Sequence, residues 1–152
     1  MEKLNLPEIS ASIRRGTGGK PEIFDIIRRR YVRLTPEEWV RQHFIHYLTG
    51  ALGYPASLIV VEAALKFNSM VKRFDILAYR TDGKPCLVVE CKSPVVEITP
   101  AVFEQVAMYN MTLAVGYLAV TNGMTHYACK IDHKQKTWSF LTEMPTFETV
   151  NR

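Results

Sequence analysis

Residues 73–92 read RFDILAYRTDGKPCLVVECK, and this stretch decides the fold class of the chain. It consists of two largely apolar runs, 73–79 and 85–92, with an Asp-Gly pair at 82–83 between them. Apolar runs of this length bounded by turn residues are typical of strands, and Asp-Gly is a common turn of β-hairpins. The stretch therefore predicts two antiparallel strands that are neighbours in a sheet.

A helix is predicted upstream of this hairpin. Thr35 is a good N-cap, Pro36 suits the first helical position, and Glu38 completes a capping box. The apolar residues that follow recur at helical spacing, namely Val40, Phe44, Tyr47, Leu48 and Ala51. Two glycines and a proline between positions 50 and 55 are expected to end the helix.

A second helix and more strands are predicted around the hairpin. The helix begins at Thr99, again an N-cap followed by proline, and extends to Ala114. Further strands are expected at 57–65, 116–120 and 125–131, with an edge strand at 138–141. The order of helix, three strands, helix and strand predicts an α/β (α+β) fold, in which a mixed sheet is flanked by helices.

The first twenty residues differ from the rest of the chain. They end in a Gly-rich stretch that lacks the sequence of a phosphate loop, so residues 1–20 are expected to form a flexible N-terminal arm. Residues 21–152 are expected to form a single domain. No apolar run reaches the ~20 residues that span a membrane, and the N-terminus lacks the apolar core of a signal peptide. We therefore expect a cytoplasmic protein with no membrane partner.

The cysteines and the net charge indicate which kinds of site and partner this chain can have. Cys86, Cys91 and Cys129 form no CxxC pair and leave an odd count, so we expect buried free thiols instead of a zinc site or a disulfide framework. The net charge of +4 permits a polyanionic partner without requiring one. Much of the positive charge lies early, at Arg14, Arg15, Lys20, Arg28, Arg29, Arg30 and Arg33. Such a run is either a binding surface or a solvated face.

Three charged residues stand in the predicted hairpin where apolar residues are usual. Glu90 and Lys92 are two apart and point to the same side of their strand, while the turn brings Asp75 onto the neighbouring strand. Carboxylates paired within a sheet are costly unless a cation such as Mg²⁺ (or Mn²⁺) neutralises them. A lysine beside such a site can position an attacking water. The alternative is a structural salt bridge between Glu90 and Lys92, with Asp75 exposed at a strand end.

Two further pairs are candidates for contacts with a polyanion. Gln105 and Tyr109 are four residues apart on the second helix and share one face, although a tyrosine at the edge of the core with a solvated glutamine would look the same. Lys72 and Arg73 precede Asp75 and could contact phosphates, although a charged strand end is equally ordinary.

Asp75, the triplet Glu90-Cys91-Lys92 and the Gln105-x-x-x-Tyr109 pair resemble the PD-(D/E)xK nuclease superfamily. The predicted order of elements is similar to the core of that superfamily, the restriction-endonuclease-like fold. Within it, residues 20–131 most resemble the N-terminal nuclease domain of type I restriction enzyme R subunits. The segments that carry this likeness are LTPEEWVRQHFIHYL, VKRFDIL, VVECKSP and TNGMTHY.

The resemblance implies an endonuclease that cleaves the phosphodiester bonds of DNA with Mg²⁺. Asp75 and Glu90 would bind the metal together with the backbone carbonyl of Cys91. Lys92 would serve the attacking water. Many members of the superfamily begin the motif with a proline, and Phe74 stands at that position here.

The resemblance also implies roles for residues around this centre. Gln105 and Tyr109 would hold DNA or orient the site. Many members have an additional acidic residue on the first helix or the first strand. Glu62 is the first candidate for it, and Glu38 is the second because a capping role already explains Glu38.

Three functions remain open from the sequence. The first is the nuclease, whose partners would be DNA, a helicase or translocase, a specificity subunit and a second copy of the chain, since these residues contain no Walker motif. The second is a module on the same fold that binds nucleic acid or a partner protein without cutting. The third is a structural protein whose charges are solvated. Metal affinity separates the first from the others.

Overall fold

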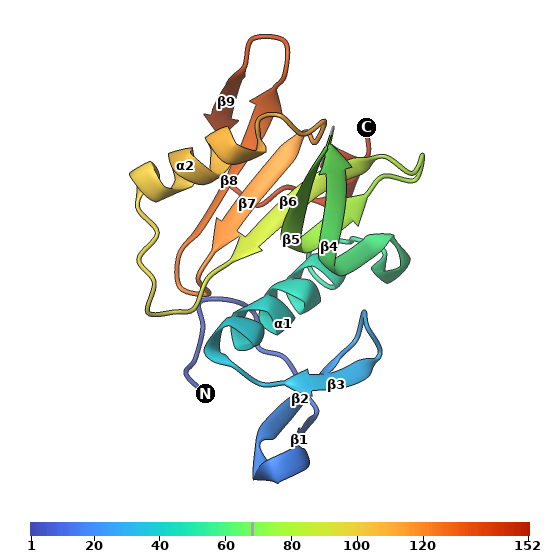
Figure 1. Cartoon of the computed structure of the whole chain (residues 1–152), viewed down its shortest axis with the longest axis vertical. Coiled ribbons are helices and arrows are strands. Elements are labelled where there is room, and N and C mark those ends of the chain that lie inside the picture. Colours follow the sequence, from blue (N-terminus) through green and yellow to red (C-terminus); the bar gives the residue numbers. More distant parts are fainter. Residues whose placement is uncertain (68) are drawn as a thin grey trace.

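The computed structural model describes residues 1–67 and 69–152, and it places one helix between two sheets (Figure 1). The larger sheet has six strands in the order β4-β5-β6-β7-β8-β9, and the smaller has three in the order β1-β2-β3. The strands are β1 (Ile13–Arg15), β2 (Pro21–Asp25), β3 (Arg30–Arg33), β4 (Ile59–Phe67), β5 (Met70–Tyr79), β6 (Pro85–Cys91), β7 (Tyr117–Thr121), β8 (His126–Asp132) and β9 (Thr137–Phe140). The α-helices are α1 (Pro36–Thr49), α2 (Pro100–Asn110) and α3 (Phe147–Val150).

The six-stranded sheet is mixed. Its strands β6 and β7 run parallel, whereas the other neighbouring pairs run antiparallel. Parallel neighbours need a crossover, and α2 supplies it between β6 and β7. The observed sheet and its flanking helices confirm the predicted fold class. The strands expected at 57–65, 116–120, 125–131 and 138–141 lie within two residues of their predicted bounds.

Both long helices begin at the caps that the sequence predicts. The Thr35 side chain accepts a hydrogen bond of 3.0 Å from the Glu38 N–H, and Pro36 follows as the first helical residue. The Thr99 side chain accepts one of 3.2 Å from the Val102 N–H. Each cap satisfies a backbone donor that would otherwise have no partner inside its helix.

The second helix is shorter than predicted, since α2 ends at Asn110 and not at Ala114. The chain turns there, with the Leu113 N–H bonded to the Asn110 carbonyl at 3.0 Å. The turn carries Leu113 and Val115 into the core, where they are 3% and 2% exposed. Both side chains pack in the same apolar cluster as Phe103 of α2, and their burial stabilises the turn.

Two apolar cores lie on opposite faces of the large sheet. On one face, Phe44 of α1 packs in a cluster with Ile76 and Val89. On the other, Phe103 of α2 packs in a cluster with Val88. The neighbouring residues Val88 and Val89 thus serve different cores, which is why β6 reads as a continuous apolar run.

The smaller sheet was not foreseen, because its strands are only three to five residues long. Its strand β1 falls within residues 1–20 and pairs with β2. Further towards the N-terminus, Leu4 is 5% exposed in the α1 core, and the Asn5 N–H donates to the Gly123 carbonyl at 2.8 Å. The mobility of residues 1–20, and their separation from a domain of residues 21–152, stay predictions.

The cysteines are buried free thiols, as expected, at Cys86, Cys91 and Cys129. They lie in or beside the two cores, where a thiol behaves as a small apolar side chain. Within residues 1–67 and 69–152, no helix is long and apolar enough to cross a membrane.

Candidate active site

Asp75 and Glu90 lie side by side on adjacent strands. β5 and β6 pair antiparallel with Ile76 opposite Val89, so the next position of the register sets Asp75 beside Glu90. The backbone N–H of Cys91 donates a hydrogen bond of 2.7 Å to Asp75 Oδ2. One strand therefore holds the carboxylate of the other in a fixed orientation.

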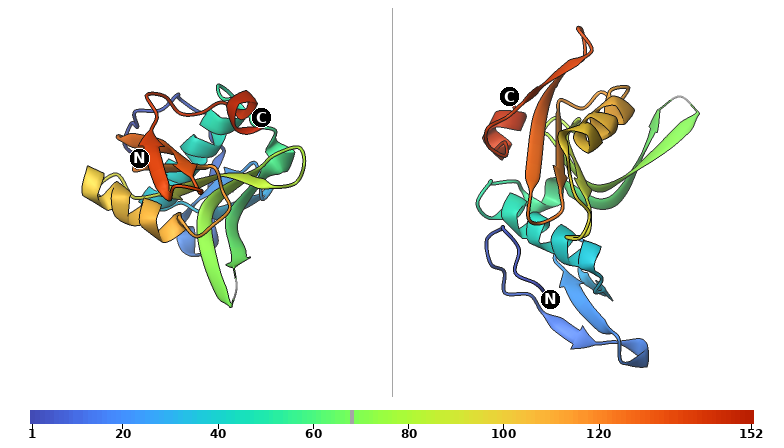
Figure 2. Two further views of the ribbon diagram at one scale, coloured as in Figure 1. Left: turned by 90° about the horizontal axis from the view of Figure 1, so that it is seen from above. Right: turned by 90° about the vertical axis from the view of Figure 1, so that its left-hand side faces the viewer.

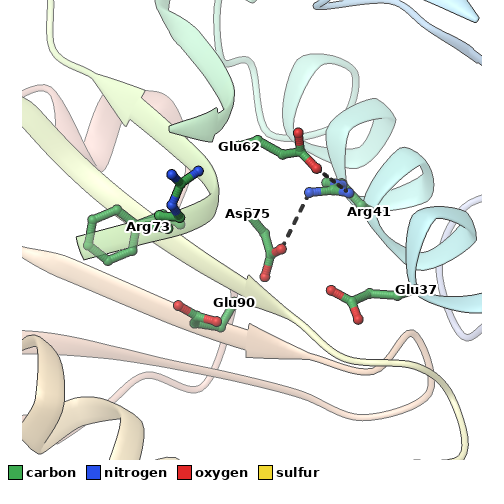
Figure 3. Close-up of a pocket in the computed structure, with 7 residues that line it drawn as sticks. Glu37, Arg41, Glu62, Arg73, Asp75 and Glu90 are labelled. Carbon is green, nitrogen blue, oxygen red and sulfur yellow. Dashed lines mark hydrogen bonds and ion pairs between the residues drawn. The ribbon is translucent and has the colours of Figure 1, made fainter. Parts of the chain in front are cut away.

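These two carboxylates line a pocket of about 330 Å³ (Figure 3). Its walls come from α1 and from strands β4, β5 and β6, and its lining residues are Glu37, Arg41, Glu62, Arg73, Phe74, Asp75 and Glu90. Figure 3 shows Asp75 between Arg41 and Glu90, with Glu37 reaching towards the same space from the start of α1. The pocket thus gathers acidic groups from four different elements of the chain.

Burial and the repulsion between neighbouring negative charges disfavour the ionised forms of Asp75 and Glu90 in this pocket. Burial, followed by the negative charge of Asp75, raises the pKa of Glu90 to about 7, while the Lys92 charge acts in the opposite direction. Burial also raises the pKa of Asp75, although the Cys91 N–H and the Arg41 guanidinium counteract it. A bound divalent cation would favour the ionised form of both groups.

The raised pKa of Glu90 predicts that the metal-free protein loses stability as the pH rises. The contribution of this carboxyl is fully present below its ordinary pKa of 4.5 and is lost as the pH rises through about 7. Between pH 5 and 8, the free energy of unfolding of the wild type should fall by about 2 kcal/mol relative to that of Glu90→Gln. Urea unfolding in a chelator measures this, with the exposed Glu104→Gln as control. A wild-type curve parallel to that of Glu90→Gln would contradict the prediction.

Arg41 connects the pocket to the interior of the protein. Its Nε and Nη2 atoms donate to the two oxygens of Glu38, each at 2.9 Å. Its Nη1 lies 3.4 Å from Asp75 Oδ1, and its Nη2 lies 3.4 Å from Glu62 Oε1. The bidentate pair with Glu38 fixes the plane of the guanidinium, which therefore gives Asp75 a positive neighbour from the protein itself.

Glu38 belongs to a buried network that joins α1 to the turn between β2 and β3. Asp25 accepts hydrogen bonds from Arg28 Nε at 2.7 Å and from Gln42 Nε2 at 2.9 Å. Arg28 Nη2 also donates to Glu38 at 3.0 Å. Of the two hydrogen bonds of the predicted capping box, the structure therefore confirms one, and the prediction of a bond from the Glu38 carboxylate to the Thr35 backbone is wrong. The Glu38 N–H does bond to Thr35, but the Glu38 carboxylate turns inwards to the arginines.

Glu62, the first candidate for an additional acidic residue, stands on β4 at the edge of the pocket. Its φ of 54° is in the left-handed region, which is uncommon for residues other than glycine. The strand changes face at this point, since Val61 packs in the α1 core and Ala63 in the α2 core. The Glu62 side chain is 57% exposed and pairs with Arg28 at 3.3 Å and Arg41 at 3.4 Å.

Glu37 is a carboxylate of the pocket that was not foreseen from the sequence. Partial burial of its carboxyl at the pocket raises its pKa, and the charge of Asp75 adds to that effect. Glu37 and Arg41 are four residues apart and share one face of α1, whereas Glu38 is rotated by ~100° about the helix axis and is buried. The i,i+4 spacing of Glu37 and Arg41 in a predicted helix was the available signal.

Three more of the predicted site residues lie beside Glu90. Lys92 directly follows β6 and is partly exposed, and its backbone N–H donates to the Thr121 carbonyl at 2.8 Å. Gln105 and Tyr109 of α2 line a shallow pocket of about 230 Å³ together with Glu90. The structure therefore brings the helix pair and the strand motif to one place.

Lys72 and Arg73 lie on opposite sides of β5. Arg73 is exposed and lines the pocket. Lys72 is 4% exposed, and its Nζ donates to the Tyr109 carbonyl and, at 2.9 Å, to the Thr112 hydroxyl. Lys72 therefore ties β5 to the end of α2, and this placement does not support the phosphate contact expected of it.

The donor atoms of the pocket suit a hard divalent cation, although they form no complete cage. Among the residues that the structure describes, no three His, Cys, Asp or Glu side chains are grouped to hold a metal ion. Mg²⁺ commonly binds through one or two carboxylates, with waters and phosphate oxygens as its other ligands. Asp75 and Glu90, with the Cys91 backbone carbonyl, fit that smaller set.

Comparison with known protein families identifies the family of this chain. The model of the type I restriction enzyme R protein N terminus matches residues 36–145. The chain belongs to this family. The matched residues include Asp75, Glu90 and Lys92, and the match confirms the resemblance seen in the sequence. The smaller sheet β1–β3 precedes the matched part.

A solved structure supports the same fold for this R-protein N terminus. The fragment structure described as an HsdR subunit of a type I restriction enzyme from Vibrio vulnificus shares 22% identity with the chain, with a TM-score of 0.53. The likeness covers 77% of this chain and 24% of that one, so the chain spans about a quarter of that relative. A search of curated proteins gave no match.

Proposed function

We propose that this chain is a Mg²⁺-dependent endonuclease that hydrolyses phosphodiester bonds of DNA in restriction or a related defence. The observation that carries the proposal is the Asp75–Glu90 pair, two carboxylates of adjacent strands whose pKa values are raised by burial. Lys92 follows two residues after Glu90, which supplies the third group of the reaction centre. Membership of the R-protein N-terminus family supports this function.

The proposed reaction centre divides its work among five groups. Asp75, Glu90 and the Cys91 backbone carbonyl would hold Mg²⁺ (or Mn²⁺). The ion supplies a Lewis acid that polarises a phosphoryl oxygen and lowers the pKa of a bound water. Lys92 orients the attacking water and offsets the negative charge that builds on the phosphate oxygens. Arg41 restrains Asp75 through its contact at 3.4 Å.

Residues around the centre are proposed to bind the substrate. Gln105 and Tyr109 share a pocket with Glu90 and would hold the DNA strand next to the scissile phosphate. Arg73 lines the main pocket and would contact a neighbouring phosphate. Lys72 is left out of this set because its ammonium group already binds the end of α2.

Two more carboxylates complete the proposed site. Glu37 is proposed as the acidic residue contributed by the first helix, because it lines the pocket and the charge of Asp75 acts on its pKa. Glu62 is kept in the site as the carboxylate that pairs with Arg28 and Arg41 at the rim. Glu38 is left out, since both of its oxygens bind buried donors.

The proposed nuclease would work with partners. These residues contain no Walker motif, so translocation along DNA would come from a helicase or translocase partner or from another part of a longer protein. A specificity subunit would select the DNA. A second copy of the chain would cut the opposite strand.

Cleavage assays test the proposal. The purified chain is incubated with supercoiled plasmid, linear duplex and single-stranded DNA in Mg²⁺, Mn²⁺ or chelator, alongside Glu37→Gln and Glu90→Gln. We expect cutting that needs the metal, that Glu90→Gln abolishes and that Glu37→Gln lowers. DNA binding without cutting under all metal conditions would contradict the nuclease.

A second candidate is a module that binds nucleic acid or a partner protein on the same fold without cutting. The contact between Arg41 and Asp75 favours it, because a guanidinium at 3.4 Å partly compensates the carboxylate without any metal. Metal titration separates the two candidates. A binding module predicts that Mg²⁺ leaves thermal stability unchanged, whereas the nuclease predicts an increase that Glu90→Gln removes.

A further inference from the structure

The smaller sheet β1–β3 carries an unusual share of the positive charge. Residues 12–34 hold seven Lys and Arg side chains against two acidic ones, a net charge of +5, whereas the whole chain has +4. The rest of the chain is therefore slightly acidic. Positive charge concentrated in so short a segment needs an explanation other than general solubility.

Only two of these cations are neutralised within the protein. Arg14 pairs with Glu22 at 2.9 Å, and Arg28 pairs with Asp25 at 2.7 Å. The other five are exposed and have no acidic partner among the residues that the structure describes, and they are Arg15, Lys20, Arg29, Arg30 and Arg33.

The outward face of this sheet carries Arg33, one of these five cations, together with Arg14 and an aromatic ring. Ile23 and Asp25 of β2 are buried at 1% and 0% exposure, which fixes the inward face. The other face carries Glu22, whose partners across the sheet are Arg14 on β1 and Arg33 on β3. The Arg14 guanidinium lies 3.8 Å from the centre of the Tyr31 ring, also on β3.

The turn between β2 and β3 places further charge next to the candidate active site. Arg28 in this turn pairs with Glu62, which lines the pocket, at 3.3 Å. Arg29 and Arg30 follow it and are exposed. The φ of Arg29 is 56°, a conformation that glycine or asparagine adopts more readily, so the turn keeps a cation at some cost in backbone strain.

We propose that the sheet β1–β3 binds the phosphate backbone of a DNA duplex and holds it against the Asp75 pocket. The inference rests on the proposed function and extends it to a part of the chain that precedes the family match at residues 36–145. The right panel of Figure 2 shows the smaller sheet projecting from the far side of α1, beyond the outline of the six-stranded sheet. A duplex at the pocket would meet it as an extension of the binding surface. Exposed arginines without acidic partners attract the negative phosphates of a duplex, and such contacts do not depend on the base sequence of the DNA.

Binding of a fluorescent 30-base-pair duplex in chelator tests this inference, because no cleavage occurs without metal. The triple variant Arg29→Gly, Arg30→Gln, Arg33→Gln removes three cations, and glycine at position 29 relieves the backbone strain and so protects the fold. Lys84→Gln, Lys130→Gln, Lys134→Gln is the matched control, with three exposed cations from the far end of the large sheet. Both triple variants lower the net charge by the same amount.

In a plot of log affinity against log salt concentration, we expect the negative slope of the sheet variant to be smaller in magnitude by roughly 3 than that of the wild type. Its affinity at low salt should be lower by ~10²-fold. The control variant should change affinity by about twofold or less. Equal effects of the two variants, or no duplex binding by the wild type, would overturn the inference. Duplex binding that depends on the sheet, without cutting in Mg²⁺, would instead reject the nuclease and leave the inference standing.

Discussion

Asp75→Asn is expected to lower Mg²⁺-dependent cutting of DNA by about 10³-fold. A neutral amide is a poor ligand for a hard cation, yet its oxygen can still accept the 2.7 Å hydrogen bond from the Cys91 N–H. The fold should therefore survive while the metal site is lost. Lys92→Ala is expected to slow cutting by a similar factor, because the charge that offsets the developing phosphate charge is gone.

Single-turnover cleavage rates and metal titration by calorimetry separate the two roles. Asp75→Asn should weaken Mg²⁺ binding, whereas Lys92→Ala should not, since removal of a nearby cation cannot repel the metal. Asp82→Asn is the matched control, because Asp82 is 44% exposed in the hairpin turn, where it pairs with Arg80, and an amide oxygen can still accept the bond from the Lys84 N–H. Cutting that survives both Asp75→Asn and Lys92→Ala would show that another site performs the reaction.

Glu38→Ala is expected to lower the free energy of unfolding by about 3–5 kcal/mol. The substitution removes the acceptor of three charged hydrogen bonds of 2.9–3.0 Å from Arg28 and Arg41. It leaves two buried or half-buried guanidinium groups with fewer partners, and Gln42 loses its bond to Glu38 as well. Removal of one member of a buried charged network costs more than the network contributes when intact, because the remaining charges stay desolvated.

Urea unfolding at pH 7 measures this loss, and the neighbouring residue provides the control. Glu37→Ala removes a carboxylate from the same first turn of α1, but Glu37 is exposed and makes no buried pair, so its substitution should cost about 0.5 kcal/mol or less. Similar losses for the two variants would mean that the buried network does not contribute as its geometry predicts.

Much of the fold and the centre of the candidate site could be predicted because the signals are local. Thr35 and Thr99 each precede a proline and start a helix, as N-caps do. The Asp-Gly turn at 82–83 predicts which strands pair, and it places Asp75 and Glu90 on neighbouring strands. The register is not fixed by the turn, because the pairing shifts between Ala78 and Tyr79, and only this shift sets Asp75 opposite Glu90.

Two side chains make contacts that the sequence did not predict. Glu38 looked like a capping residue, but two arginines and a glutamine compete for its carboxylate. Lys72 looked like a phosphate contact, but its ammonium group binds the Tyr109 carbonyl and the Thr112 hydroxyl at the end of α2. Arg41 and Gln42 lie within about one helical turn of Glu38, whereas Arg28 lies 10 positions from Glu38 and Tyr109 lies 37 positions from Lys72.

The sequence by itself determined the order of helices and strands between residues 35 and 141, the placement of Asp75 and Glu90 on neighbouring strands, and the family to which the chain belongs. Caps, turns and the alternation of side chains act over a few residues, so each can be read without knowledge of the rest of the fold. Only the tertiary structure decided that Glu37 and not Glu38 faces the pocket, and that Arg41 lies next to Asp75. Those contacts join residues far apart in the chain, 34 positions in the case of Arg41 and Asp75, and they are fixed by how α1 packs against the sheet.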